Sequence, residues 1–419
     1  MTRSGVIICL VVLLTALGPA AMDVSAADGE ATILSLPGHV TTDGIGLASR
    51  GQHVVVVWQA TTMNADTEGG SHLFIARSHD GGATFEAPRR VNQGAGFSAG
   101  GGEQAPRPLF VSDQEILIVW RASHDKQDVV QVSRSIDGGE SFARAVPLHD
   151  SALSGYQGFH SAAVAPDGAL HVTWLDGRNA DGPKRSPHGA PRQDVYHASW
   201  QSGDVPVETQ LEQDVCFCCK TATAIASDGS ILAAWRHIYP GHLRDFAFAR
   251  AIAGRFEPAI RVSEDGWELQ GCPDDGAAMA VDGSGGVHLV WPTVIQELPA
   301  VKRVFYGYSA DGGSFAPRVS LPHLGGDTMS HPQITIVGDR LVVVWDENLD
   351  GRRRVAFAYG QVDDAGAPTF RPATALTADG RARYPVVAPV GDDVTVAWTQ
   401  TPGEQTDTVV ALRRLRLGD

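Results

Sequence analysis

Seven of the nine tryptophans in this chain of 419 residues end short runs of aliphatic and β-branched residues, and they recur every 53 to 62 residues. The first run is Val54-Val55-Val56-Val57-Trp58, and the last is Val394-Thr395-Val396-Ala397-Trp398. The other five runs end at Trp120, Trp174, Trp235, Trp291 and Trp345. Internal repeats of this length with strand-like content are typical of arrays of small sheets. Because the runs are unbroken, they also indicate strands that are buried on both faces.

Each repeat contains the same series of predicted strands. A first strand ends in a turn such as Pro166-Asp167-Gly168, and the tryptophan strand, a third strand and a fourth strand follow it. The last repeat has only three strand candidates, whereas residues 31–36 form a spare strand before the first repeat. Pairing of the spare strand into the last sheet would remove the open edges of the array. The sequence therefore predicts an all-β fold, a β-propeller of seven four-stranded blades closed by an N-terminal strand, with six blades as the alternative.

Composition excludes several other classes of protein. The chain has 47 Gly and 24 Pro but only 19% charged residues, which argues against a long helical bundle. Its 43% hydrophobic content argues against disorder. The net charge of −15, without a basic stripe, makes the chain a poor candidate for binding nucleic acid.

The N-terminus has the pattern of a secretory signal. Arg3 precedes an apolar run over residues 6–17, and small residues follow at Val24-Ser25-Ala26. We therefore expect a signal peptide over residues 1–26 and one mature domain over residues 27–419. No later stretch has about 18 consecutive apolar residues, so we expect no membrane span in the mature chain. A periplasmic or secreted monomer is the expected form.

A second motif lies between the third and fourth predicted strands. Ser78-His79-Asp80-Gly81-Gly82-Ala83-Thr84-Phe85 recurs as Ser135-Ile136-Asp137-Gly138-Gly139-Glu140-Ser141-Phe142, and a shorter copy is Ser309-Ala310-Asp311-Gly312-Gly313-Ser314-Phe315. The aspartate can accept turn amides, the glycines permit positive φ, and the aromatic ring can anchor the turn. These copies resemble the Asp-box, or BNR, repeats of sialidase-like propellers. In that family the boxes lie away from the catalytic face, which implies a structural role here.

Strand direction predicts where a ligand site would form. Strands alternate in direction within a blade, so the loops that lead into first strands lie on the same face as the loops that follow second strands. The Asp boxes follow third strands and therefore lie on the opposite face. First strands line the central channel, so these loops converge on its mouth. The residues expected there include Arg107, His160, Cys216, Cys218, Cys219, Lys220, Arg236, His237, Cys272, Asp274, Asp275, His331, Asp346, Glu347, Arg383 and Tyr384.

The four cysteines of the expected mature chain allow two interpretations. An even number in an exported chain favours disulfides, for which three pairings are possible. The alternative is a thiolate site for copper or zinc, or a redox site, made by Cys216, Cys218, Cys219 and Cys272, with His160, His237 or His331 as further ligands.

The resemblance to sialidases implies a further candidate site. Such enzymes hold a substrate carboxylate with arginines and use an aspartate as acid/base and a tyrosine as nucleophile. Here Arg107, Arg236 and Arg383 could form the cluster, with Tyr384 and Asp275 nearby. The family's Arg-Ile-Pro motif is absent, and Arg383-Tyr384-Pro385 and Arg107-Pro108 match it only in part.

Three functions follow as hypotheses. The first is a binding propeller whose channel mouth holds a glycan, another small ligand or a metal. The second is an exo-sialidase-type glycoside hydrolase, and the third is a copper, zinc or thiol redox protein.

Overall fold

The structure is a computed structural model that describes residues 31–62, 70–93, 97–98, 100–124, 127–150, 155–180, 192–296, 299–363, 367–378, 380–403 and 407–417. The signal peptide expected over residues 1–26 lies outside the described residues. Within them, one short 3-10 helix, η1 (Gly102–Gln104), accompanies an otherwise all-β fold. The described part of the chain contains no helix with the length and apolar character needed to cross a membrane.

The first half of the chain forms sheets from strands that follow one another in sequence. One sheet consists of β2 (His39–Arg50), β3 (His53–Thr62), β4 (Ser71–Ser78) and β5 (Arg89–Arg90). The next consists of β6 (Phe97–Ser98), β7 (Arg107–Phe110), β8 (Ile116–His124), β9 (Gln127–Ser135) and β10 (Val146–Pro147). A third consists of β11 (Gln157–Val164), β12 (Leu170–Asp176), β13 (Asp194–Trp200) and β14 (Val207–Glu212).

The second half continues in the same way. A five-stranded sheet contains β15 (Ala222–Ile225), β16 (Ile231–Arg236), β17 (Phe246–Ile252), β18 (Arg255–Phe256) and β19 (Ile260–Arg261). The next set contains β20 (Ala278–Val281), β21 (Val287–Ile295), β22 (Val301–Ser309) and β23 (Val319–Ser320). It is followed by β24 (Thr328–Val337), β25 (Arg340–Leu349), β26 (Arg352–Val362), β27 (Pro368–Phe370) and β28 (Thr374–Ala375). A single parallel bridge, Lys302 to Thr328, joins these two sets into one nine-stranded sheet.

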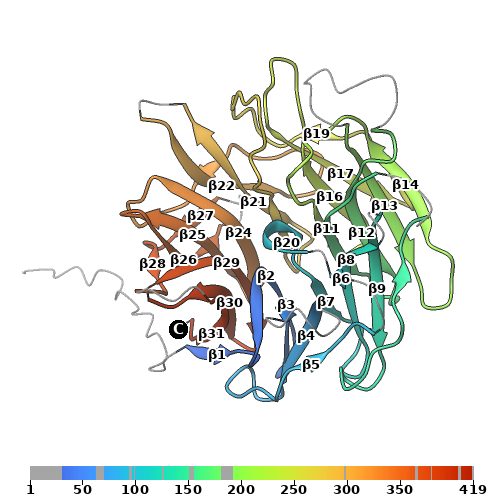
Figure 1. The fold of residues 1–419 in the computed structure, drawn as a ribbon. Coiled ribbons are helices and arrows are strands. Elements are labelled where there is room, and N and C mark those ends of the chain that lie inside the picture. Colours follow the sequence, from blue (N-terminus) through green and yellow to red (C-terminus); the bar gives the residue numbers. More distant parts are fainter. Residues whose placement is uncertain are drawn as a thin grey trace, which may run out of the picture.

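The last sheet combines both ends of the described chain. It contains β29 (Arg381–Val390), β30 (Asp393–Thr401) and β31 (Val409–Leu415), and β1 (Thr32–Leu34) pairs antiparallel with β31. Figure 1 shows the sheets arranged around the middle of the molecule, with β2, β20, β24 and β29 on the inner side. Neighbouring inner strands contact one another, and β29 packs against β2. This radial arrangement is that of a β-propeller.

The seven repeated tryptophans lie where the sequence predicts, each in the strand that pairs with the inner strand of its set: β3, β8, β12, β16, β21, β25 and β30. All seven are at most 1% exposed. They pack between sheets, as Trp398 does against Val344 and Phe357 of the preceding set. The core therefore consists of apolar layers between adjacent sheets, which accounts for the unbroken apolar runs.

The predicted aspartate turns have the expected local geometry. The Thr84 amide donates to Asp80 Oδ1 at 2.9 Å, and the Ser141 amide donates to Asp137 Oδ1 at 3.0 Å. Hydrogen bonds from the Thr84 and Ser141 side chains are the main reason why the pKa values of these two aspartates fall to about 2. The turns are thus held by local contacts.

Candidate functional site

A pocket of about 550 Å³ opens where the first strands of the last sheets begin. It is lined by Pro273, Asp274, Lys302, Ser330, His331, Asn348, Gly351, Arg353, Arg381, Arg383 and Tyr384. Lys302 is the second residue of β22, and the Asp311 turn follows the other end of the same strand. Nine extended residues span about 30 Å. The pocket therefore lies at the opposite end of this sheet from the Asp311 turn, as strand direction predicts.

Unusual backbone at the start of the inner strands positions several of these side chains. Asp274, His331 and Tyr384 have φ of 47°, 52° and 51°, in the left-handed region that non-glycine residues seldom adopt. His331 and Tyr384 also lie within β-bulges, between Ser330 and Gln333 and between Arg383 and Val386. Such bulges redirect side chains and are frequent beside functional sites. Here they bring His331 and Tyr384 together at the pocket.

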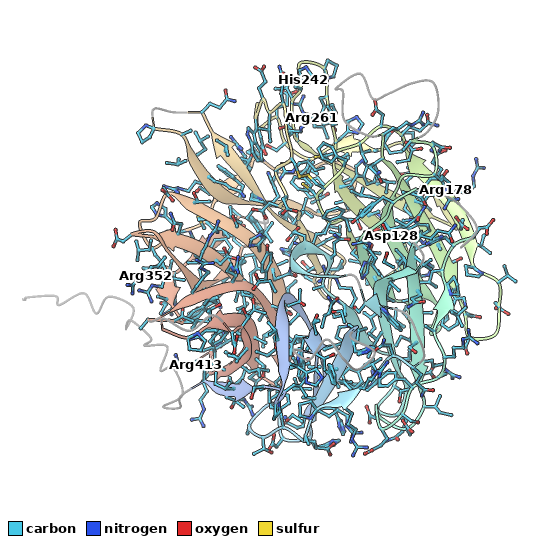
Figure 2. The ribbon with its side chains drawn as sticks, viewed as in Figure 1. Asp128, Arg178, His242, Arg261, Arg352 and Arg413 are labelled. Atoms are coloured by element: carbon cyan, nitrogen blue, oxygen red, sulfur yellow. A yellow bond between two sulfur atoms is a disulfide. The ribbon has the colours of Figure 1, made fainter. Side chains whose placement is uncertain are left out.

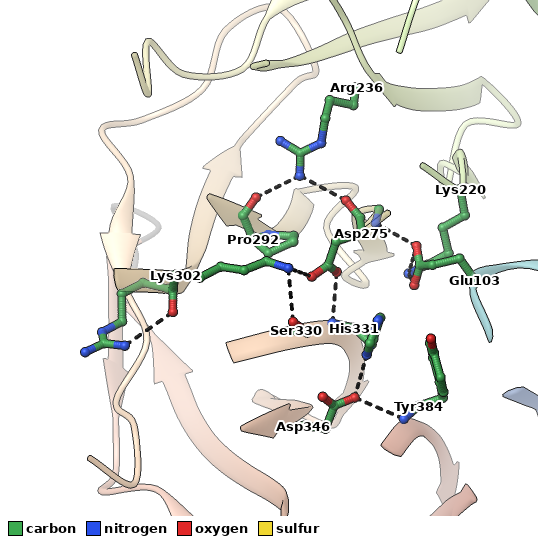
Figure 3. Close-up of polar contacts among 12 residues, drawn as sticks. Glu103, Lys220, Arg236, Asp275, Pro292, Lys302, Ser330, His331, Asp346 and Tyr384 are labelled. Carbon is green, nitrogen blue, oxygen red and sulfur yellow. Dashed lines mark hydrogen bonds and ion pairs between the residues drawn. The ribbon is translucent and has the colours of Figure 1, made fainter. Parts of the chain in front are cut away.

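His331 and Tyr384 form a pair that is organised by one buried carboxylate. Their ring centroids are 4.0 Å apart. Asp346 Oδ2 lies 2.5 Å from His331 Nδ1 and accepts the Tyr384 amide at 3.0 Å (Figure 3). Arg353 Nη1 lies 2.5 Å from the other oxygen of Asp346. Residues from several strands are therefore held by one side chain.

The electrostatic surroundings act differently on the two rings. Burial alone would lower the pKa of His331, but the charges of Asp346 and Asp275 outweigh it and raise this pKa. Burial raises the pKa of Tyr384, and the negative charges of Glu103, Asp274 and Asp346 raise it further. Both shifts favour the protonated forms of the two rings, a charged imidazole beside a neutral phenol.

Two buried ion pairs lie behind this pair. Lys220 Nζ lies 3.0 Å from Glu103 Oε1, and the Gly276 amide donates to Glu103 Oε2 at 2.6 Å. Asp275 forms an ion pair with Lys302, and it accepts a hydrogen bond from the His331 amide at 2.9 Å (Figure 3). Burial would raise the pKa of Asp275, but Lys302 and His331 lower it. Each of the two carboxylates is thus paired with a lysine within the protein.

Glu103, Asp275 and His331 offer ligand atoms that all lie within 4.8 Å of one another. Such a group of oxygen and nitrogen donors could in principle hold a cation. In this structure Lys220 and Lys302 already supply positive charge to the two carboxylates. The group is therefore better explained as a charge network that supports the pocket.

The five residues predicted by sialidase resemblance do not form one cluster. Arg383 and Tyr384 line the pocket, and Arg383 Nη2 lies 2.5 Å from Asp43 Oδ2. Arg236 is 1% exposed, donates to the backbone carbonyls of Arg244, Asp275 and Pro292, and does not line the pocket, so its role in holding a substrate stays a prediction. Asp275 is fully buried and does not line the pocket, and its role as a general acid stays a prediction.

Arg107 also lies outside the residues that line the pocket. It begins β7, where burial lowers its pKa and Glu103 opposes that effect. The guanidinium groups that do line the pocket are those of Arg353, Arg381 and Arg383. Arg381 and Arg383 are two residues apart in one strand, so alternation places them on the same face. The sequence alone could have indicated this shared position. The presence of Lys302, Arg353 and Asp274 in the pocket depends on which loops of different sheets meet, and the sequence alone does not show this.

The four cysteines of the expected mature chain divide into a bonded pair and a free pair. Cys218 and Cys272 form a disulfide with a Cα–Cα distance of 6.0 Å, whereas Cys216 and Cys219 are free and buried. In this structure Cys218 and Cys272 therefore offer no free thiol, because their sulfurs are bonded to each other. The disulfide joins the loop before β15 to the loop before β20, directly beside Pro273 and Asp274 of the pocket.

The three predicted histidine ligands do not accompany the cysteines. Among the described residues, the sulfur cluster consists of Cys216, Cys218 and Cys219 alone. His160 is buried with Nε2 at 3.3 Å from the Val119 carbonyl, and burial lowers its pKa to about 3. The ring of His237 packs against that of Tyr239, and His331 belongs to the pocket. The structure therefore does not bring the four cysteines and the three histidines together at one place.

Comparison with known proteins supports the fold. The sequence matches no protein-family model and no curated protein sequence. The structure is similar to that of polysaccharide lyase Uly1, with 11% identity, a TM-score of 0.54, and coverage of 90% of each chain. It is also similar to a PL25 ulvan lyase, with 11% identity, a TM-score of 0.53, and coverage of 92% of this chain and 96% of that one. For Trypanosoma rangeli sialidase the identity is 10% and the TM-score 0.48, over 76% of this chain and 54% of that one.

Proposed function

We propose that the pocket binds an acidic sugar unit of a glycan through its carboxylate. The observation that carries this proposal is that three arginines, Arg353, Arg381 and Arg383, line one pocket. Arg353 is fixed through Nη1 by Asp346, and Arg383 through Nη2 by Asp43. A guanidinium has five N–H donors, so each retains donors for a ligand while its position is fixed.

Other properties of the pocket support a sugar ligand. Ser330 and Asn348 add neutral hydrogen-bonding groups beside the cations, and Tyr384 adds an aromatic surface. A small number of polar groups on a preformed pocket gives orientation and specificity to a small ligand. The two solved structures named above that share the fold at TM-scores above 0.5 are polysaccharide lyases. An acidic polysaccharide or its fragments is therefore the class of ligand that we propose.

Calorimetric titration with matched acidic and neutral oligosaccharides tests this proposal. We expect sialylated or uronate-containing oligosaccharides to bind and their neutral counterparts not to bind. Arg383→Gln removes a charge-assisted hydrogen bond and should weaken binding roughly 10- to 100-fold. Arg352→Gln is the matched control, because Arg352 is exposed and lies outside the pocket lining (Figure 2). Equal binding of acidic and neutral sugars would contradict the proposal.

Hydrolysis of a sialoside is a second candidate, favoured by the position of Asp274. This residue lines the pocket, and burial, together with the charge of Glu103, raises its pKa. A carboxyl group with a raised pKa can act as a general acid. Figure 3 shows the Tyr384 hydroxyl pointing toward Glu103. Asp274, Tyr384 and Glu103 would then take the roles of acid/base, nucleophile and assisting carboxylate.

Turnover assays separate binding from catalysis. A fluorogenic sialoside reports hydrolysis, and ultraviolet absorbance of an unsaturated uronate reports cleavage by β-elimination. If hydrolysis occurs, Asp274→Asn and Tyr384→Phe should each abolish it while calorimetric binding persists. Absence of product from either class of substrate, with acidic-sugar binding retained, would leave the protein as a binding propeller.

We further infer that the sheets form seven blades of a single propeller over residues 27–419, closed by β1, and that residues 1–26 are removed on export. The seven tryptophan strands, the contact of β29 with β2 and the pairing of β1 with β31 support this inference. Resemblance to Asp-box propellers and the net charge of −15 support an exported monomer that does not bind nucleic acid. Intact mass of the protein recovered from the periplasm, together with its mass in solution, tests processing and oligomeric state.

A further inference from the structure

Two thiols remain free beside the disulfide, and they lie in an apolar core. Cys216 and Cys219 are each 1% exposed and pack among Val195, Trp235 and Ala249. They have Cys-x-x-Cys spacing, so one loop carries both. We propose that Cys216 and Cys219 form a two-coordinate site for Cu(I). Neither thiol is among the residues that line the pocket, and the site requires no glycan ligand.

The geometry brings the two thiols together without a ligand. The sulfurs of Cys216, Cys218 and Cys219 all lie within 4.8 Å of one another. The Cys219 thiol donates a hydrogen bond to the Cys216 sulfur, so the two side chains already meet. Two sulfurs at this separation can bind one ion between them as thiolates, the form that binds metals.

Two buried arginines beside the thiols form no salt bridge with a carboxylate among the described residues. Arg236 and Arg244 are each 1% exposed, and both interact electrostatically with Cys216. Among the described residues, both guanidinium groups donate only to backbone carbonyls, and Nε and Nη1 of Arg244 have no partner. The nearby buried carboxylate, Asp245, forms its ion pair with Arg261. Buried cations of this kind require a compensating anion.

Charge balance distinguishes a metal complex from a second disulfide. A disulfide between Cys216 and Cys219 would be neutral and would leave the arginines uncompensated. Two thiolates around Cu(I) carry a net charge of −1, which these arginines would stabilise. Binding of one Cu(I) displaces the thiol protons and changes no oxidation state. The structure therefore favours the anionic complex over either neutral form.

The number and type of donors select the metal. Cys218 is bonded to Cys272, so the cluster offers only two free sulfurs. Structural zinc sites have four ligands, usually sulfur and nitrogen. Among the described residues, no histidine or carboxylate joins the sulfur cluster. Soft thiolates favour Cu(I), which is stable with two of them.

Anaerobic titration with Cu(I), supplied as its acetonitrile complex and competed with bathocuproine disulfonate, tests the proposal on the full chain. We expect one tightly held Cu(I) per chain and protection of two thiols from alkylation. Cys216→Ser and Cys219→Ser should each abolish tight binding. Arg244→Met keeps both thiols and should weaken binding roughly 10- to 100-fold, as loss of a supporting residue around a metal site usually does.

Two controls keep the result interpretable. The double variant Cys218→Ser, Cys272→Ser removes the disulfide but should retain one Cu(I), which separates loss of ligands from loss of the cross-link. Thiol counting on the unmodified protein, purified anaerobically, needs no variant and should give two free thiols. Two disulfides in that sample, free thiols that bind no Cu(I), or tighter binding of Zn(II) would each overturn the proposal.

Discussion

Asp346 shows how much of the site depends on a single buried residue. It contacts His331, Arg353 and the Tyr384 amide, which come from three different strands. Burial would raise its pKa, but the charge and hydrogen bond of His331 lower it. A fixed carboxylate at this position therefore sets both the orientation and the charge of the pocket.

The raised pKa of His331 predicts a pH dependence of stability. Its folded pKa lies above the ordinary value of about 6.5. The charged ring therefore stabilises the protein fully below that value, and this contribution is lost as pH rises through the folded pKa. Urea unfolding of the wild type and His331→Gln across a pH series measures the effect. We expect the difference in unfolding free energy to shrink with rising pH, and a difference independent of pH would contradict the assignment.

The buried pair of Glu103 and Lys220 makes a second prediction at the residue scale. Lys220→Met leaves the Glu103 charge unpaired and should cost about 3–5 kcal/mol of unfolding free energy. The double variant Glu103→Gln, Lys220→Met removes both charges and keeps an acceptor for the Gly276 amide, so it should recover much of that loss. Equal destabilisation of the single and double variants in urea would show that the charges are not coupled.

At the scale of elements, the loops before the inner strands differ from the strands that they precede. The tryptophan strands are regular, whereas the starts of β24 and β29 contain bulges and left-handed residues. The alternation of apolar and polar residues predicts a regular strand, but it does not show where a bulge inserts an extra residue. That extra residue reverses which of the following side chains face the channel. The positions of His331 and Tyr384 could thus be predicted only to the correct end of the sheet.

The disulfide between Cys218 and Cys272 links two such loops, 54 residues apart in sequence. A cross-link over a loop of this length stabilises a protein by about 2–4 kcal/mol, mainly by restricting the unfolded chain. We expect Cys218→Ser, Cys272→Ser to lower the unfolding free energy by that amount in the absence of metal. Cys216→Ser, Cys219→Ser is the matched control and should leave the cross-link intact. Similar losses in both variants would argue against a special role for the disulfide.

For the whole molecule, the pairing of β1 with β31 joins the first described strand to the last sheet (Figure 1). Without β1, β31 would expose its backbone hydrogen-bonding groups at an open edge. Exposure of that edge favours both unfolding and association with another chain.

Truncation tests whether this pairing holds the molecule together. Removal of residues 1–36 should lower the midpoint of thermal unfolding and promote aggregation, because it deletes β1. Removal of residues 1–30 is the control, since it retains β1, and we expect a midpoint close to that of the mature protein. If the two truncated proteins unfold at the same temperature, β1 does not stabilise the fold.

The sequence alone determined the features that depend on near neighbours along the chain. The tryptophan strands, the aspartate turns at Asp80 and Asp137, and the end of the sheets that holds Tyr384 all follow from alternation, turn chemistry and strand direction. These patterns are local, so they persist wherever the sheets are placed.

Only the tertiary structure decided which distant residues meet. Arg236 and Asp275 lie on the predicted face, but packing buries them, whereas Arg353 and Asp274 line the pocket. Likewise, the sequence allowed three cysteine pairings, and the placement of the loop before β20 next to the loop before β15 selected Cys218 with Cys272. Such outcomes depend on the distances between separate sheets and on the cost of burying charge, and neither quantity is encoded in the spacing of residues along one strand.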